Sequence, residues 1–158
     1  MSQLLHEFAC AILIDTQGRF LLQLRDNVSE ILYPGQVGLF GGHREGGESF
    51  LQCVVREINE EISYYVAPGR FQYLATYDGM LHSKGARARG AIFLADGIPA
   101  DSLVVTEGSL LIVPQAKLAE IEHKLSPSAS FALTNLLGDP AKGSGRSHEK
   151  APPFARQG

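Results

Sequence analysis

Hydrophobic residues at the start of the chain fall into two short runs separated by a turn. Residues 6–15 form the first run and residues 19–24 the second, and each has the length of a strand. The residues between them, Thr16-Gln17-Gly18, favour turns. The pattern predicts an antiparallel hairpin. Residues 26–38 contain a proline and two glycines, so we expect a loop there that leads to a short segment at Leu39-Phe40.

After Ser49 the spacing of apolar residues changes to three and four, which is the period of a helix. The apolar face consists of Phe50, Leu51, Val54, Val55, Ile58 and Ile62. Ser49 is a good N-cap, and Gln52 three residues later completes a capping box. We expect a helix from Ser49 to about Ser63.

Strands and helices follow one another in the remainder of the chain. The expected strands are residues 71–77, 88–94 and 103–105, and the expected helices are residues 114–122 and 127–137. A loop at residues 78–87 separates the first two strands. Ser126 followed by Pro127 is typical of a helix start. Strands mixed with helices indicate a layered α/β domain.

Composition limits the number of domains and the class of partner. The chain has 158 residues, of which 44% are hydrophobic and 20% charged, and this suits one folded domain, which we place at residues 1–138. Residues 139–158 are rich in Gly, Pro and Ser and are expected to be disordered. The net charge of −3 offers no basic surface for a long nucleic acid.

The apolar run near the amino end is short and follows no Lys or Arg, so we interpret it as a buried strand rather than a signal peptide. No apolar stretch of the sequence approaches the roughly 20 residues of a membrane-spanning helix. These observations predict a cytoplasmic protein without a membrane partner. Cys10 and Cys53 stand among apolar residues, which favours core packing for both.

Acidic residues cluster on the helix expected after Ser49. Glu57, Glu60 and Glu61 are one turn or less apart, so their carboxylates share an arc. Such charges repel one another unless a cation compensates them, and oxygen ligands favour Mg²⁺ or Mn²⁺ over zinc. A solvated acidic face paired with Arg56 is the alternative. Glycines before the helix allow a tight loop whose amides face an anion together with the helix dipole.

The run from Gly42 to Glu48, followed by Arg56-Glu57-Ile58-Asn59-Glu60-Glu61, resembles the signature of the Nudix hydrolases. That signature reads G-x5-E-x7-R-E-U-x-E-E-x-G-U, with U an aliphatic residue. The resemblance implies an α/β/α sandwich with a mixed β-sheet. It also implies an enzyme that uses Mg²⁺ or Mn²⁺ to cleave a phosphoanhydride bond. The substrate would be a nucleoside diphosphate linked to another moiety, as in a nucleoside triphosphate, a nucleotide sugar or ADP-ribose.

The same resemblance implies roles for individual residues. The implied metal ligands are Glu57, Glu61, the Gly41 carbonyl and Glu60, which would otherwise orient water as a base. Arg56 is expected to orient a carboxylate through a bidentate pair rather than touch substrate. Glu48 is expected to approach the site as a metal ligand or a base. Ser63 and Tyr64 depart from the signature, and because a left-handed helix end costs serine roughly 1 kcal/mol, we expect the helix to stop elsewhere without loss of a ligand.

Residues that contact the rest of the substrate are harder to identify. The charged or imidazole candidates are Arg25, His43, His82, Lys84, Arg87, Arg89 and Glu107. A solvated basic loop explains residues 82–89 at least as well, and a loop histidine such as His43 is more often a bystander than a phosphate contact. The resemblance implies that Glu107 supplies an additional acid from a downstream loop, and a surface residue is the equal alternative. The aromatic candidates for stacking on a base are Tyr33, Phe40 and Tyr77, and each would also suit core packing.

Two other functions deserve comparison with hydrolysis. The isopentenyl diphosphate isomerases share the implied fold but need a cysteine and a glutamate placed for carbon protonation, and Cys53 within the helix does not suit that role. A nucleotide sensor without catalysis is disfavoured by the intact acidic residues of the signature. The expected partner is therefore a small nucleotide-type molecule, and a homodimer is common among small enzymes of this kind.

Overall fold

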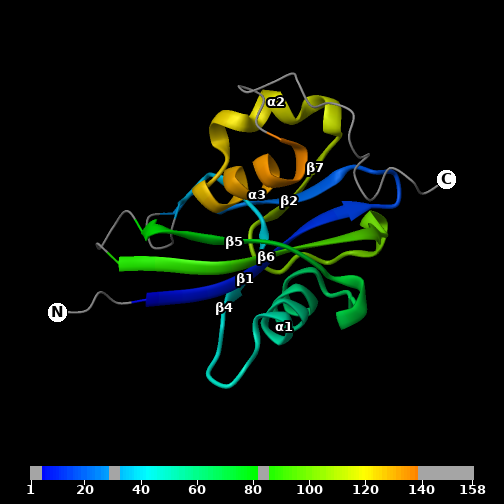
Figure 1. Ribbon diagram of the computed structural model, residues 1–158. Helices are drawn as coiled ribbons and strands as arrows, with labels where there is room; N and C mark the ends of the chain where they lie inside the picture. Colours follow the sequence, from blue (N-terminus) through cyan, green and yellow to red (C-terminus); the bar gives the residue numbers. More distant parts are fainter. Residues whose placement is uncertain (1–4, 29–32, 82–85, 139–158) are drawn as a thin grey trace.

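The computed structural model describes residues 5–28, 33–81 and 86–138, which form a mixed sheet between helices (Figure 1). Within these residues the sheet has seven strands. They are β1 (Leu5–Asp15), β2 (Phe20–Leu24), β3 (Val37–Gly38), β4 (Phe40–His43), β5 (Gln72–Leu81), β6 (Ala86–Ile98) and β7 (Ser109–Val113). Helix α1 (Phe50–Ile62) covers one face and α3 (Pro127–Leu137) the other. This is the α/β/α sandwich expected from the sequence.

Strand β1 is the centre of the sheet. Its end pairs antiparallel with β2 and its first half pairs antiparallel with β4, while β6 runs parallel along its other edge. Strand β5 pairs antiparallel with β6, and β7 pairs antiparallel with β2. The expected hairpin is confirmed, with Leu13 opposite Leu21. The parallel pairing of β1 with β6 makes the sheet mixed.

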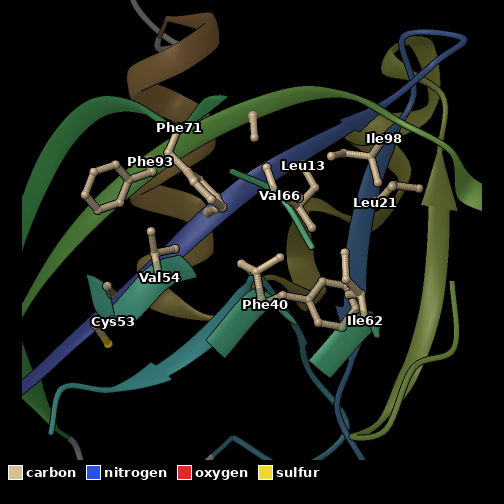
Figure 2. Close-up of a cluster of buried hydrophobic side chains, with 14 of the residues drawn as sticks. Leu13, Leu21, Phe40, Cys53, Val54, Ile62, Val66, Phe71, Phe93 and Ile98 are labelled. Atoms are coloured by element: carbon tan, nitrogen blue, oxygen red, sulfur yellow. The ribbon is translucent and has the colours of Figure 1, made fainter. Parts of the chain in front are cut away.

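Alternate side chains of β1 contribute to two separate cores, because successive residues of a strand point to opposite faces. Ala9, Ala11 and Leu13 face α1, and Figure 2 shows the cluster there, with Phe40 from β4 and Val54 from α1. The even-numbered residues Cys10, Ile12 and Ile14 belong to the cluster under α3. Small residues on the α1 side leave room for that helix to lie close to the sheet. Cys10 and Cys53 are both buried, as expected.

Helix α1 begins as the sequence predicts, but its end differs from the prediction. The Ser49 Oγ accepts the Gln52 N–H at 3.0 Å, and the Ser49 N–H donates to Gln52 Oε1 at 2.8 Å, so the capping box is confirmed. Ser63 then adopts a left-handed conformation with φ 55° and ψ 39°. The helix stops where a glycine would stop it, so the expected change in its end is wrong.

Two expectations about strands are corrected. Residues 103–105 form no strand, because the Val104 N–H donates instead to the Ile62 carbonyl at the end of α1 at 3.1 Å. The strand of this region is β7, which the sequence reading missed. The loop expected at residues 78–87 is shorter, because the ladder of β5 and β6 continues through Asp78 opposite Arg89 to Leu81 opposite Ala86.

The helix expected at residues 114–122 is also corrected, whereas the last helix is confirmed. The segment consists of the 3-10 turns Gln115–Lys117 and Glu122–Lys124 on either side of α2 (Leu118–Ile121), since i to i+3 hydrogen bonds tighten both ends. Helix α3 has Pro127 in its first turn and Ser126 as its cap. In the described ranges no helix has the length and apolar composition needed to cross a membrane. Residues 139–158, expected to be disordered, lie outside those ranges.

Candidate functional site

Arg56, in the middle of α1, collects the acidic residues of the helix and of the loop before it. Its Nε donates to Glu48 Oε2 at 2.6 Å and its Nη2 to Glu48 Oε1 at 3.0 Å, which makes a bidentate pair. Its Nη1 donates to Glu57 Oε2 at 3.0 Å and to Glu60 Oε1 at 3.4 Å. The bidentate partner is therefore Glu48, in the loop, and one guanidinium donates hydrogen bonds to three carboxylates.

Glu48 is the carboxylate that this arrangement stabilises most. Besides the two bonds from Arg56, its Oε1 accepts the Glu45 N–H at 2.8 Å. The Arg56 guanidinium, with help from that N–H, lowers the pKa of Glu48 from 4.5 to about 2. Glu48 thus stays ionised at neutral pH and ties the loop to the helix.

Arg44 fastens the same loop to the sheet and was not identified from the sequence. Its guanidinium pairs with Glu7 on β1 and donates to the Glu48 carbonyl at 2.6 Å. The guanidinium carbon also lies 5.4 Å from the centre of the Phe50 ring, in cation–π range. The loop between β4 and α1 is therefore held at both of its ends.

Glu61 has the opposite environment. Only 6% of the residue is exposed, and its Oε1 accepts the Gly41 N–H at 3.0 Å. Burial is the main reason that the pKa of Glu61 rises from 4.5 to about 8, and the charges of Glu107 and Glu57 raise it further against the opposing Gly41 bond. Burial also raises the pKa of Glu57, although Arg56 opposes this. At neutral pH this pair holds a proton or needs a cation.

Two glycines of β4 allow these carboxylates to lie where they do. A Cβ atom at Gly41, whose φ is +147°, would lie 2.2 Å from the Ala9 carbonyl oxygen. A Cβ atom at Gly42 would lie 2.5 Å from Glu57 Oε1. Any larger residue would push β4 away from β1 or from Glu57, so the glycines are required by close approach.

A pocket of about 400 Å³ opens beside these carboxylates. One part of its wall is acidic and includes Glu57, Glu61 and Glu107. Another part is aromatic and apolar, and its members are Phe8, Tyr33, Leu39, Tyr77, Met80 and Ala88. Arg25, His6 and His43 supply the basic and imidazole groups. A pocket of this size suits a small organic ligand.

The donors present fit a hard divalent cation in their chemistry. In the described part of the chain, no group of three or more His, Cys, Asp or Glu side chains is already arranged as a metal site. Arg56 hydrogen-bonds to Glu57 and Glu60, and the Gly41 amide hydrogen-bonds to Glu61. Buried carboxylates with raised pKa values have oxygen atoms and surplus negative charge, which are the properties that Mg²⁺ and Mn²⁺ select.

The structure brings some of the predicted substrate residues to the pocket and leaves others away from it. Arg25, His43 and Glu107 line it, as do Tyr33 and Tyr77. Phe40 does not, because its ring is fully buried in the core below α1. His82 and Lys84 lie outside the described residues.

Arg87 and Arg89 lie on β6 rather than in a loop, and neither lines the pocket. The Arg87 Nη2 donates to Asp78 on β5 at 3.0 Å, and the Arg89 Nη2 lies 3.9 Å from the same carboxylate. Their neighbour Ala88, which points to the other face of the strand, does line the pocket. The strand period therefore turns the two arginines away from it.

The sequence did not indicate Phe8, which together with Tyr77 forms the aromatic floor of the pocket. Phe8 lies over Gly90 of β6, where a Cβ atom would come within 2.2 Å of its ring. The Phe8 ring centre is 6.2 Å from that of Tyr77, which in turn packs against Phe131 of α3 at 5.3 Å. Burial, followed by the proximity of Tyr33, raises the pKa of Tyr77. These contacts join residues far apart in sequence, so no local pattern indicates them.

Comparison with known proteins agrees with this architecture. The family model of the NUDIX domain matches residues 4–108. The MutT NUDIX hydrolase of Burkholderia pseudomallei is 22% identical, with a TM-score of 0.65 over 84% of this chain and 98% of that one. The MutT protein of Methanosarcina mazei Go1 is 20% identical, with a TM-score of 0.71 over 91% of this chain and 99% of that one.

A third similar structure belongs to a larger protein. The bifunctional NMN adenylyltransferase/ADP ribose pyrophosphatase of Francisella tularensis, complexed with AMP and a Mn ion, is 16% identical with a TM-score of 0.70. The alignment covers 86% of this chain and 42% of that one. At these sequence identities the structural similarities show a shared fold only. No curated protein matches the chain in sequence.

Proposed function

The chain belongs to the Nudix family of pyrophosphohydrolases, and from this premise we propose that it is a divalent-metal-dependent enzyme acting on a nucleoside diphosphate linked to another moiety. The observation that carries the proposal is the buried Glu61 beside Glu57, in the acidic wall of a pocket that also has an aromatic floor. Carboxylates that are buried to this degree favour the binding of a cation, and the aromatic floor suits packing against a nucleobase.

In this proposal Glu57, Glu60, Glu61 and the Gly41 carbonyl hold Mg²⁺ or Mn²⁺. When bound, such a cation lowers the pKa of a bound water and stabilises charge on phosphoryl oxygens. Glu48 is a poor base because Arg56 holds its pKa at about 2, so we assign it, with Arg56, to fixing the loop and orienting Glu57. Glu60, the most exposed of the three helix carboxylates, remains available to orient water.

The pocket supports a nucleotide as the substrate class. Phe8 and Tyr77 present ring faces and edges on which a base can pack. Arg25 and His43 line the same pocket and suit contacts with phosphate oxygens. The Francisella tularensis neighbour was crystallised with AMP and a Mn ion, which supports the same two classes of ligand here.

The test is hydrolysis of a panel of nucleoside triphosphates, nucleotide sugars and ADP-ribose with Mg²⁺, with Mn²⁺ and with a chelator. We expect phosphate or nucleoside monophosphate products that require the metal and fall sharply in Glu57→Gln. The matched control is Glu120→Gln, which changes an exposed glutamate of α2 paired with Lys117. Tight nucleotide binding without turnover under either metal would favour the sensor instead.

A further inference from the structure

The segment after the 3-10 turn Ala100–Ser102 is attached to the last turn of α1. The Val104 N–H donates to the Ile62 carbonyl at 3.1 Å, and the Thr106 N–H donates to the Glu61 carbonyl at 2.9 Å. The Thr106 Oγ1 donates to the Glu60 carbonyl at 3.0 Å. The last carbonyls of a helix have no hydrogen-bond donors within the helix, and this segment supplies donors to them. It is thereby held in register with two of the acidic residues of α1.

A second attachment holds the other end of the segment to β2. The Gln23 Nε2 donates to the Glu107 carbonyl at 3.0 Å, and only 4% of Gln23 is exposed. Arg25 Nη1 donates to Gln23 Oε1 at 3.4 Å, which orients the amide. Gly108, with φ +68°, lies so close to β2 that a Cβ atom would come 2.5 Å from the Leu24 carbonyl oxygen. Glu107 therefore stands between two fixed points.

The residue fixed in this way belongs to the acidic wall. Glu107 lines the pocket with Glu57 and Glu61, in the place where the family resemblance implies an additional acid from a downstream loop. We propose that Thr106 and Gln23 are positioning residues for this carboxylate, and that they hold Glu107 beside Glu57 and Glu61 at the divalent cation. This inference rests on the metal dependence proposed above.

A purely structural role for the segment makes a different prediction. If Thr106 only caps α1, its loss lowers the thermal stability and leaves cation affinity unchanged. If it acts through Glu107, its loss weakens cation binding. The same loss then has no further effect on cation binding in a protein whose Glu107 is replaced by a neutral residue. Residues that orient metal ligands typically contribute about tenfold or more to metal affinity, so the two cases are separable.

The experiment is a titration of the metal-free protein with Mn²⁺ alone. Calorimetry and the electron paramagnetic resonance signal of the free ion measure the binding. We expect Thr106→Val and Gln23→Met each to weaken Mn²⁺ binding about tenfold, and Thr106→Ser to retain it. Thr106→Val should change nothing further in a Glu107→Gln background. The matched control is Thr76→Val, which removes an exposed hydroxyl of β5 bonded to Tyr73.

Each outcome decides the inference. Additive losses in the double variant, or a lowered melting temperature of Thr106→Val with unchanged Mn²⁺ affinity, would overturn it, and the threonine series alone suffices if Gln23→Met does not fold. Hydrolysis that survives alongside such a result leaves the proposed function standing. Conversely, Mn²⁺ binding with the expected pattern but no turnover on any substrate supports the positioning and contradicts the function. A wild-type protein that takes up no Mn²⁺ contradicts both.

Discussion

Two clusters of charged side chains in this protein differ in their solvent exposure and in the sign of their excess charge. The Arg56 cluster has one guanidinium within 4 Å of four carboxylates, those of Glu45, Glu48, Glu57 and Glu60. The Asp78 cluster has two guanidiniums, those of Arg87 and Arg89, around the one carboxylate of Asp78. The first borders the acidic pocket. The second lies on the surface of β5 and β6, with each side chain more than 40% exposed.

The difference identifies where charge has consequences. The exposed pairs of the Asp78 cluster are screened by water and contribute little to stability, typically less than about 1 kcal/mol. The Arg56 cluster has more negative than positive charge and adjoins the buried Glu61. Two of its carboxylates, those of Glu48 and Glu57, have side chains only 16% and 15% exposed, so water screens them less. We therefore interpret the first as the reactive region and the second as a solvated surface.

The largest expected effect is that of Glu57→Gln. It removes a charged oxygen ligand while retaining volume, so turnover should fall by roughly 10²–10³-fold, as for other lost electrostatic contacts. The melting temperature should not fall, because burial already opposes the charge of Glu57. Turnover and thermal melting measured on the same preparation check both expectations. Turnover equal to that of the wild type would remove Glu57 from the mechanism.

The next effect is a pH dependence of stability that resides in Glu61. Its pKa is about 8 in the folded protein and 4.5 in the reference state, so between these values the folded state retains a proton that the unfolded state releases. The stabilisation is complete below pH 4.5 and is lost as pH rises through 8. The free energy of unfolding of the metal-free protein should fall over this range by an amount on the order of 5 kcal/mol.

Denaturant unfolding at pH 5, 6.5 and 8 measures this slope. Glu61→Gln should flatten most of it, since a glutamine there still accepts the Gly41 N–H without ionising. Asp78→Asn, on the exposed cluster, should leave the slope as it is in the wild type. A Glu61→Gln protein with the same slope as the wild type would mean that Glu61 ionises normally.

Arg-to-Lys exchange in the two clusters gives a smaller, directly comparative effect. Arg56→Lys keeps the charge and loses the bidentate geometry with Glu48, so we expect about a tenfold loss of turnover. Arg87→Lys loses only an exposed pair, so its turnover should match that of the wild type. Steady-state kinetics of both variants at one metal concentration make the comparison. A larger loss from Arg87→Lys would place substrate contacts on β6.

The smallest expected effect is that of substituting Ser63 at the end of α1, which should change stability without changing turnover. Ser63→Gly relieves a left-handed serine and should raise the free energy of unfolding by about 1 kcal/mol. Ser63→Ala retains a Cβ atom in the same conformation and should give no gain. Thermal melting reports the stability, and turnover should be unchanged in both. A Ser63→Gly protein less stable than the wild type would show that the serine side chain has a compensating partner.

The elements that could be predicted from the sequence are those held by interactions between residues close together in the chain. The capping box of Ser49 and Gln52 involves residues three apart, and the β1 and β2 hairpin turns within a few residues, so both were predictable. The same holds for the spacing of Glu57 and Glu61 on one helix. Each of these depends on hydrogen bonds or periods that fit within a single turn or helix.

Contacts between distant segments were beyond such a reading. Residues 103–105 have the apolar composition of a strand, yet the Val104 N–H donates to the Ile62 carbonyl at the end of α1. The alternation along β6 places Ala88 in the pocket and turns Arg87 and Arg89 to Asp78, which depends on register with β1 and β5. The seating of Phe8 over Gly90 and the attachment of Glu107 to Gln23 likewise join residues more than 80 positions apart.

The proposed chemistry requires that the acidic wall next to the Arg56 cluster binds a divalent cation. Anomalous scattering from crystals soaked in manganese tests it most directly. We expect a manganese peak bonded to carboxylate oxygens of Glu57 and Glu61, with no peak at Asp78. Full-strength data with no peak beside Glu57 and Glu61 would contradict it.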